Sequence, residues 1–450
     1  MDEIISDIID RGLKLARLYG TDGAEIYGVK ELTTTVRGDR RGVKNIVKGD
    51  KLVVGIRVAI GKRVVTQGGV ISKISDLDYI FGKAVKIAKT LPEDNRWSSL
   101  PDKLGRSDAV VVVADEVRYP DLGQIRELSN YIVKGVNDLD RRAFVSDVLI
   151  NLTYFSRFIG NSFGISLGES GTRAIVSVNV KAVDNGHESG YTDHYVGTTL
   201  KKFEPADLIS KVTEVAIKTL IAKRIPTGIY EVILTPKVFK YVFEDLIIPA
   251  LCADQIQRNR SPLKGKLGLD VFSEELTVFD DGIYPSMVGT KGFDDEGIPT
   301  RRKCLIERGV VRSFLYDSYT ANIDRCESTG NAFRPTPSHS PSPWRSNIIV
   351  NPGSDDLTSL TRGIRKGLIV YDVIGMWLSN PINGLLNATV SNAILVEDGL
   401  DKHPVKGVII SGNIYELLAN DGISLTARAE HYGSYALPYI YVPKVSVAGI

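Results

Sequence analysis

The chain has 450 residues, of which 43% are hydrophobic and 24% are charged, as in an ordinary soluble protein. At this length two domains are expected, each able to bury a sizeable core. The formal net charge is only +2, and Lys and Arg are interspersed with Asp and Glu. This balance argues against an electrostatic nucleic-acid binder. No run approaches the ~20 apolar residues that a membrane helix requires.

The first residues and the cysteines of the chain indicate the cellular compartment of the protein. Met1-Asp2-Glu3 is acidic where a signal peptide would be basic. Cys252, Cys304 and Cys326 are widely spaced, so neither a disulfide framework nor a cysteine metal cluster is indicated. We therefore expect a cytoplasmic protein that associates with no membrane and no nucleic acid.

The first third of the chain mixes helical and strand patterns. The predicted elements are a helix over residues 2–19, short strands over 24–30 and 33–37, strands over 52–60 and 63–66, and a helix over 76–90. Gly61-Lys62 fits a two-residue turn between the second pair of strands. The local basic excess from Arg37 to Lys51 is interpreted as a solvated hairpin. Pro92 and Pro101 make residues 91–106 resemble a linker.

The next segment leads to a domain boundary. A helix is predicted over residues 121–136, strand after strand from Ala143 to Gly197, and a helix over 203–222. Arg224-Ile225-Pro226-Thr227-Gly228 then interrupts the pattern. We place the boundary there, with an N-terminal α+β domain at 1–223 and a C-terminal β-rich domain at 224–450.

The C-terminal part begins with a buried strand over residues 230–234 and a helix from Pro236 through Asp254, with the proline in its first turn. Beyond Leu276, short apolar strands are separated by Gly, Asn, Asp and Pro, which is typical of a barrel or sandwich. The predicted fold class is α+β: an N-terminal α/β domain with antiparallel strands and helices, then a C-terminal β-rich, barrel-like domain with a few helices.

Motifs for metal and serine chemistry are weak. His187-Glu188 lacks a second histidine one helical turn on, since the next is His194 in a strand-like region. Residues 160–164 match Gly-x-Ser-x-Gly literally, but strand-and-turn sequence follows where a nucleophile elbow needs a helix. A glycine-flanked hairpin turn is the favoured interpretation.

Two acidic segments are the remaining candidates for chemistry. Asp280-Asp281-Gly282 and Asp294-Asp295-Glu296-Gly297 could supply an acid and a base, or oxygen ligands for a hard cation. Asp-Gly is also a common turn signal. From the pattern alone, residues 292–300 fit a hairpin tip or a cleft for a polar substrate equally well.

An ordered series of segments in the C-terminal half resembles the TldD/PmbA (TldE) peptidase family. These segments are residues 278–282, 292–300, 305–310, 315–321, 328–334, 396–399, 404–405 and 410–413. The match spans roughly residues 225 to 450, and a looser one covers the strand around Gly55 and the helix leading to Leu91. The resemblance implies two related subunits that form a zinc-dependent peptidase, which trims unfolded peptides in a chamber between them.

The resemblance also implies which subunit this is. The family's catalytic subunit carries a His-Glu-x-x-x-His helix before the Asp-Asp-Gly segment, and a cysteine ligand further on. Here approximately Glu244 and Pro249 take the two histidine positions, and no cysteine follows Cys326. The chain thus resembles the PmbA/TldE-type subunit, with no catalytic residue and no metal ligand of its own, and zinc is expected in a TldD-type partner.

For this subunit we predict a peptide groove, with a heterodimer or higher assembly and a possible homodimer when alone. Arg334 would bind a peptide carboxylate or pair with Glu296 or Glu327. Residues predicted to line or brace the groove are Asp294, Asp295, Glu296, Gly297, Thr300, Tyr319, Thr320, Ser328, Thr329, Gly330, Asn331 and Arg334. Two alternatives stay open: a stand-alone hydrolase using a carboxylate pair or another bound ion, and a structural homodimer that binds an unrelated ligand.

Overall fold

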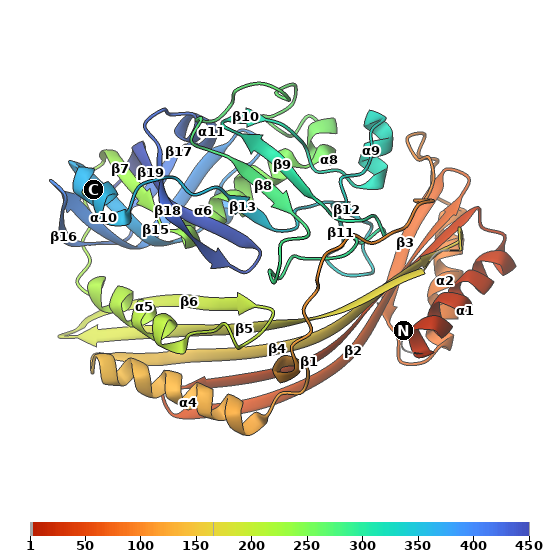
Figure 1. The fold of residues 1–450 in the computed structure, drawn as a ribbon, viewed down its shortest axis with the longest axis horizontal. Helices are drawn as coiled ribbons and strands as arrows, with labels where there is room; N and C mark the ends of the chain where they lie inside the picture. Colours follow the sequence, from red (N-terminus) through yellow and green to blue (C-terminus); the bar gives the residue numbers. More distant parts are fainter. Residues whose placement is uncertain (1–2, 165, 450) are drawn as a thin grey trace.

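The N-terminal half is a six-stranded antiparallel sheet in the order β3-β2-β1-β4-β5-β6, in a computed structural model that describes residues 3–164 and 166–449 (Figure 1). Its elements are α1 (Glu3–Tyr19), β1 (Gly23–Asp39), β2 (Gly42–Ile60), β3 (Arg63–Val70), α2 (Ser75–Ala88), α3 (Asp115–Arg118), α4 (Leu122–Leu139), β4 (Ala143–Asn161), β5 (Ser166–Asp184), β6 (His187–Gly197) and α5 (Pro205–Lys218). Helices cover one side of this sheet, and the C-terminal half lies on the other.

The face of the sheet that the helices cover is apolar. Ile26 and Ile56 belong to a core cluster that also includes residues of α1 and α2. Val148, Ile150 and Leu152 of β4 belong to a second cluster, which includes residues of α4 and α5. Each half of the sheet therefore has its own pair of helices packed against it.

The opposite face of the sheet is rich in charge, because successive side chains of a strand alternate between faces. Glu25 of β1 lies opposite Arg57 of β2, and Arg157 of β4 lies opposite Glu169 of β5. This is the face turned toward the C-terminal half.

The C-terminal half contains a closed ring of strands. β19 pairs with β17, then β15, β14 and β7 follow in order, and β7 pairs back with β19. Strands β13, β8, β9 and β10 extend the sheet outward from β19. The strands are β7 (Gly228–Leu234), β8 (Val278–Asp281), β9 (Arg302–Glu307), β10 (Val310–Val311), β11 (Ala332–Phe333), β12 (Ser342–Pro343), β13 (Ile348–Val350), β14 (Lys366–Ile374), β15 (Leu385–Glu397), β16 (Leu400–Val405), β17 (Ile409–Asn413), β18 (Ser424–Tyr432) and β19 (Tyr435–Ala448).

The helices of this half are short. They are α6 (Pro236–Val242), the π-helical turn η1 (Phe243–Ile247), α7 (Ile248–Leu251), α8 (Ala253–Gln257), α9 (Ser318–Asp324), α10 (Leu357–Gly363), the 3₁₀ turn η2 (Met376–Leu378) and α11 (Ile414–Leu418). The barrel core contains Tyr230, Phe239, Phe243 and Tyr435. The mixed α+β class and the barrel-like C-terminal half predicted from sequence are confirmed.

The prediction of one continuous helix from Pro236 through Asp254 is wrong. It widens into the π turn η1 just before Pro249, whose ring nitrogen has no hydrogen to donate. It then ends at Cys252, which is extended and bridges to Leu315, and α8 starts anew. The π turn and the isolated bridge to Leu315 therefore interrupt the local helical pattern.

In the N-terminal half one prediction is corrected and two are confirmed. The two short strands over 24–30 and 33–37 are one continuous strand, β1, because it pairs along its length with both β2 and β4. The hairpin turn at Gly61 is present, with φ of 57°. Residues 160–164 lie at the end of β4, which pairs antiparallel with β5, so this segment is a hairpin turn and not a nucleophile elbow.

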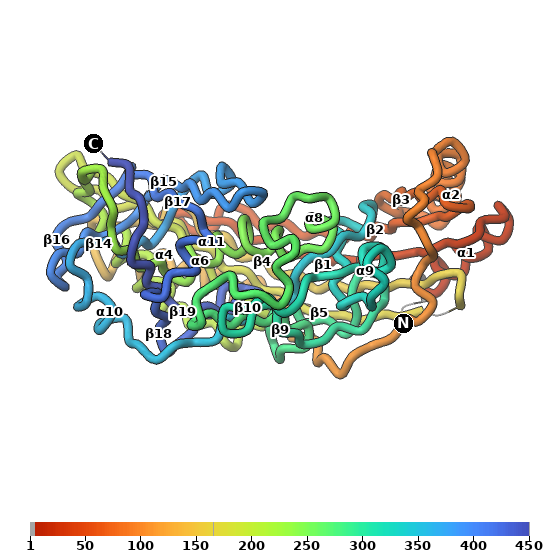
Figure 2. The backbone as a smooth tube through the Cα atoms, turned by 90° about the horizontal axis from the view of Figure 1, so that it is seen from above, coloured from red at the N-terminus to blue at the C-terminus, as the bar shows by residue number. Residues whose placement is uncertain are grey.

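Seen from above, α1, α2 and β3 lie at one end of the molecule and the barrel strands lie toward the other (Figure 2). The first sheet ends at Gly197 and the strands of the second begin at Gly228. A domain boundary at 223/224 stays a prediction. Among the described residues, no helix is both long enough and apolar enough to cross a membrane.

Candidate functional site

The acidic segment at residues 292–300 is buried between the two halves. Asp294, Asp295 and Glu296 are all at most 2% exposed. Asp294 organises a tight turn, because its carboxylate accepts the backbone N–H groups of Glu296 (2.9 Å), Ile298 (3.0 Å) and Ala332 (2.9 Å). Gly297 has φ of 84° within this turn, a conformation that favours glycine. The segment is thus a turn, and its acids face protein groups.

Asp295 binds an arginine of the N-terminal sheet. Arg157 Nη1 lies 2.9 Å from Asp295 Oδ1, and Arg157 Nε lies 2.6 Å from Glu169 Oε1. The same guanidinium donates to the carbonyl of Phe293 and lies 4.2 Å from the centre of its ring. Arg157 therefore holds the turn against strands β4 and β5.

Glu296 binds a second arginine of the sheet. Arg57 Nη1 lies 2.7 Å from Glu296 Oε1, and Arg57 Nη2 lies 2.6 Å from Glu25 Oε2. Glu25 also accepts a hydrogen bond from Arg334, whose own backbone N–H donates to Asp295 Oδ2 at 2.9 Å. Arg334 thus forms a structural bridge, to Glu25 instead of the predicted Glu296 or Glu327.

We call these groups the interdomain ion network: Glu25, Arg57, Arg157, Glu169, Asp295, Glu296 and Arg334. All seven side chains are at least nine-tenths buried. Burying a charge is costly unless it is paired and hydrogen-bonded, and here each charge has an opposite partner. The network ties the two halves together, because three of its ion pairs cross between them: Arg57–Glu296, Arg157–Asp295 and Glu25–Arg334.

Asp317 adds a pH-sensitive carboxyl beside the network. Its Oδ1 caps α9 by accepting the backbone N–H of Thr320 at 2.8 Å. The backbone N–H of Ser318, which follows Asp317 in the chain, donates to Glu296 Oε2 at 2.8 Å. Burial, and then the charge of Glu296, raise the pKa of Asp317 to about 7.

We expect this carboxyl to make stability depend on pH below neutrality. A carboxyl whose pKa is raised in the folded state stabilises the fold fully at pH values below its unfolded-state pKa. This stabilisation is lost as the pH rises through the folded-state pKa of about 7. Wild type should therefore lose thermal stability between about pH 5 and pH 7.5. Asp317→Asn keeps the capping oxygen and should lose less over the same interval.

The control is Asp140→Asn, because the Arg142 side chain lowers the pKa of Asp140 to about 2, far outside that interval. Its difference in melting temperature from wild type should be the same at both pH values. An equal pH dependence in wild type and Asp317→Asn would contradict the assignment.

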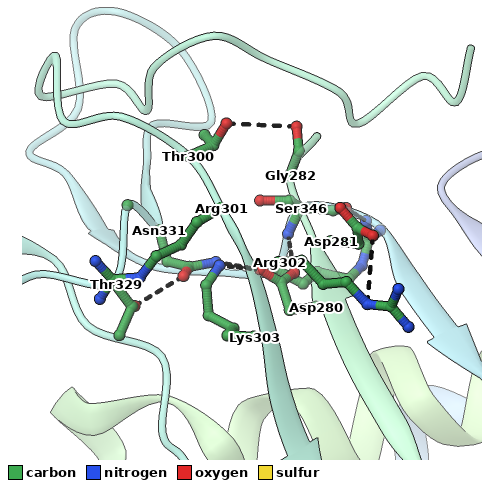
Figure 3. A network of polar contacts seen from close by, with 12 residues as sticks. Asp280, Asp281, Gly282, Thr300, Arg301, Arg302, Lys303, Thr329, Asn331 and Ser346 are labelled. Atoms are coloured by element: carbon green, nitrogen blue, oxygen red, sulfur yellow. Dashed lines mark hydrogen bonds and ion pairs between the residues drawn. The ribbon is translucent and has the colours of Figure 1, made fainter. Parts of the chain in front are cut away.

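A second polar network surrounds Asp280 on β8 (Figure 3). Lys303 Nζ lies 2.6 Å from Asp280 Oδ2, and Asn331 Nδ2 donates to the same oxygen at 2.9 Å. Thr329 Oγ1 lies 2.7 Å from Asn331 Oδ1, which fixes the orientation of the amide. The predicted residues Thr329 and Asn331 thus brace the Asp-Asp-Gly segment.

Three more of the predicted residues form hydrogen bonds around α9. Tyr319 donates to Asp94 at 2.6 Å, which ties the helix to the segment that follows α2. Ser328 donates to the carbonyl of Tyr316 at 3.2 Å. Thr320 donates to the capping carboxylate, that of Asp317, at 2.6 Å. All three side chains are therefore engaged within the chain.

The last two predicted residues are Gly330, which lies against the acidic segment, and Thr300, which ends it. A Cβ at Gly330 would lie 2.5 Å from the carbonyl oxygen of Pro299, so the backbones approach too closely for a side chain. Thr300 donates to the carbonyl of Lys291, across the base of the turn. A role in a peptide groove stays a prediction for all of these residues.

Two domain families match this sequence. Residues 116–220 match the PmbA/TldA metallopeptidase central domain, and residues 227–449 match the PmbA/TldA metallopeptidase C-terminal domain. The chain belongs to the TldD/PmbA family.

Relatives and solved structures agree with membership of the TldD/PmbA family. An uncharacterized protein of Methanocaldococcus jannaschii is 27% identical over 91% of this chain and 92% of its own length. A metalloprotease PmbA homolog of Buchnera aphidicola is 24% identical, with 78% of each chain covered. The crystal structure of TldE from Thermococcus kodakarensis has the same fold, with a TM-score of 0.89, 23% identity, and coverage of 99% of this chain and 100% of that one.

The helix that the TldD/PmbA resemblance associates with zinc carries a different arrangement here. Glu244, in the π turn η1, accepts from Arg345 Nε at 2.9 Å and from Tyr435. Lys240 lies one turn before it, and burial lowers the pKa of that lysine. Within the described part of the chain, no three His, Cys, Asp or Glu side chains gather as a metal site would need.

Sequence reasoning missed the groups of the interdomain ion network that the N-terminal sheet supplies: Glu25, Arg57, Arg157 and Glu169. No local pattern links them to the acidic segment, because Arg57 lies 239 residues from its partner Glu296. The available signal was their position: charged residues in the middle of otherwise apolar strands. Such residues are expected to be paired when the strand is buried on both faces.

Proposed function

We propose that this chain is the zinc-less subunit of a TldD/PmbA-type metallopeptidase, and forms one wall of the chamber that receives unfolded peptides. The observation that carries the proposal is the Glu244–Arg345 ion pair on the helix where a catalytic subunit would place its histidines. Glu244 Oε2 is 2.8 Å from Arg345 Nη2, so this carboxylate already has a cationic partner. No histidine occurs between His194 and His339.

The residues at 294–296 and their neighbours serve this function as a brace. Their burial and pairing support a rigid wall whose shape does not depend on substrate. Strand edges would then bind the peptide through main-chain hydrogen bonds, which accept many different peptide sequences.

The barrel rim offers a surface for the partner subunit. Ile374, Trp377, Leu378, Ile382 and Leu385 follow one another along 12 residues of chain and are all exposed, Trp377 by 77%. Exposed apolar patches of this kind mark interaction sites, and tryptophan is enriched at interface hot spots. We place the contact with the zinc-bearing subunit on this rim.

The decisive experiment is reconstitution with a His-Glu-x-x-x-His subunit from the same genome. Zinc content and cleavage of an unfolded peptide are measured for each chain alone and for the mixture. We expect chelator-sensitive cleavage from the mixture and neither zinc nor cleavage from this chain alone. Stoichiometric zinc together with chelator-sensitive cleavage by the chain alone would overturn the proposal and favour a stand-alone hydrolase.

Trp377→Glu should weaken association with that partner by at least about 30-fold, equivalent to roughly 2 kcal/mol at an interface hot spot. The matched control is Leu400→Glu, an exposed apolar residue beyond the opposite end of β15. Analytical ultracentrifugation of the chain alone and of the mixture measures both effects, including any homodimer. Equal affinity of both variants for the partner would show that the rim is not part of the interface.

A further inference from the structure

A cavity of about 580 Å³ lies where the tip of the β1–β2 hairpin meets α4 and the start of β4. Arg40, Arg41 and Gly42 come from the hairpin tip. Asn130, Val133, Lys134 and Asn137 come from α4, where their spacing places them on one face of the helix. Arg141, Ala143, Phe144 and Val145 complete the lining. The size is that of a small-molecule site.

The cavity is lined by four cations and no carboxylate: Arg40, Arg41, Lys134 and Arg141. Among the described residues, none of the four lies within ion-pair distance of an acid. The nearby acids are already taken, since Asp39 pairs with Lys44 at 2.9 Å, and Asp140 and Asp184 pair with Arg142. The positive charge facing the cavity is therefore uncompensated.

Two features position these groups. The guanidinium of Arg40 lies 5.3 Å from the centre of the Phe144 ring, which restrains it by a cation–π contact. Asn130 and Asn137 add amide donors on the helix side. Glu25 and Arg57 lie near the other end of the β1–β2 pair, so this cavity is separate from the interdomain ion network.

We propose that this cavity binds a small anion with two or more phosphate groups. Arginine forks match phosphate oxygens in pairs, and a lysine adds a point charge. A compact oligophosphate brings several negative charges to four clustered cations, whereas a monophosphate engages only part of the set. The site is independent of the proposed peptidase role, because it involves neither Glu244 nor the barrel rim.

Calorimetric titration with inorganic triphosphate tests the proposal, at fixed ionic strength on the purified full chain. We expect saturable binding, and at least about 10-fold weaker binding for the Arg40→Ala/Arg141→Ala variant. The control removes two exposed charges from the same hairpin but outside the cavity, Lys48→Ala/Lys51→Ala, and should change the affinity less than about 2-fold.

Parallel titrations identify the source of the phosphate. Equal affinity for a nucleoside triphosphate and inorganic triphosphate means that the phosphates alone are recognised, and tighter binding of the nucleotide means that its organic part also contacts the cavity. Either result supports the site. No saturable binding of triphosphate, equal losses in both double variants, or binding of only a single-stranded oligonucleotide would overturn it.

Discussion

Arg157→Ala should lower the free energy of unfolding by about 3 kcal/mol, because Glu169 and Asp295 lose their buried cation. They keep only the more exposed Arg106, at 3.6 Å from Glu169, and Lys291, at 3.3 Å from Asp295. The arginine side chain is 4% exposed, so water cannot replace the lost contacts. Urea denaturation followed by circular dichroism measures the loss. We also expect the two halves to unfold at more separated midpoints, since the variant removes a link between them.

The control for this prediction is Arg142→Ala. Arg142 also pairs with two carboxylates, Asp140 and Asp184, but on the protein surface. Exposed pairs are screened by water and contribute little. The loss should therefore be much smaller than for Arg157→Ala. Similar losses in the two variants would show that burial of the network does not set its contribution.

Gly55→Ala should disturb the packing of residues 335–341, a loop with three prolines, against the N-terminal sheet. A Cβ at residue 55 would lie 1.7 Å from the carbonyl oxygen of Pro337, which is backbone and cannot rotate away. Overpacking of this kind costs about 1–3 kcal/mol. We expect a lower melting temperature and faster proteolysis within residues 335–341.

Gly69→Ala is the matched control, because it adds the same methyl group to the neighbouring strand β3. There the nearest atom, Ile80 Cδ1, would lie at 3.5 Å, an ordinary contact. This variant should keep the proteolysis pattern of wild type. If both alanine variants behave alike, then the close approach of Pro337 is not what requires glycine at position 55.

The fold class was accessible from sequence, because periodicity and turn residues report directly on local structure. The Gly61 turn and the helix predicted over residues 121–136, found as α4 at Leu122–Leu139, are examples. The break predicted between residues 30 and 33 is wrong for a physical reason. Glu31 is polar and Leu32 is exposed, which suggests a loop, but pairing with both β2 and β4 keeps the backbone extended there. Tertiary pairing is not encoded in a short window.

The site was harder to predict, for a related reason. Three consecutive acids indicate exposure when considered alone, yet Asp294, Asp295 and Glu296 are buried. Their partners lie far away in the sequence: Arg157 is 138 residues from Asp295. The acidic segment could be recognised from its pattern, whereas the arginines that neutralise it required the fold.

The charged face of the N-terminal sheet has a consequence for synthesis. The first half of the chain emerges from the ribosome before residues 292–334 exist, and domains fold as units in that order. Its unpartnered face then presents Glu25 opposite Arg57 and Arg157 opposite Glu169, pairs that this half supplies by itself. These pairs keep part of the face hydrated before the C-terminal half is made, whereas Tyr27 and Ile159 beside them stay uncovered until Phe293 packs on them.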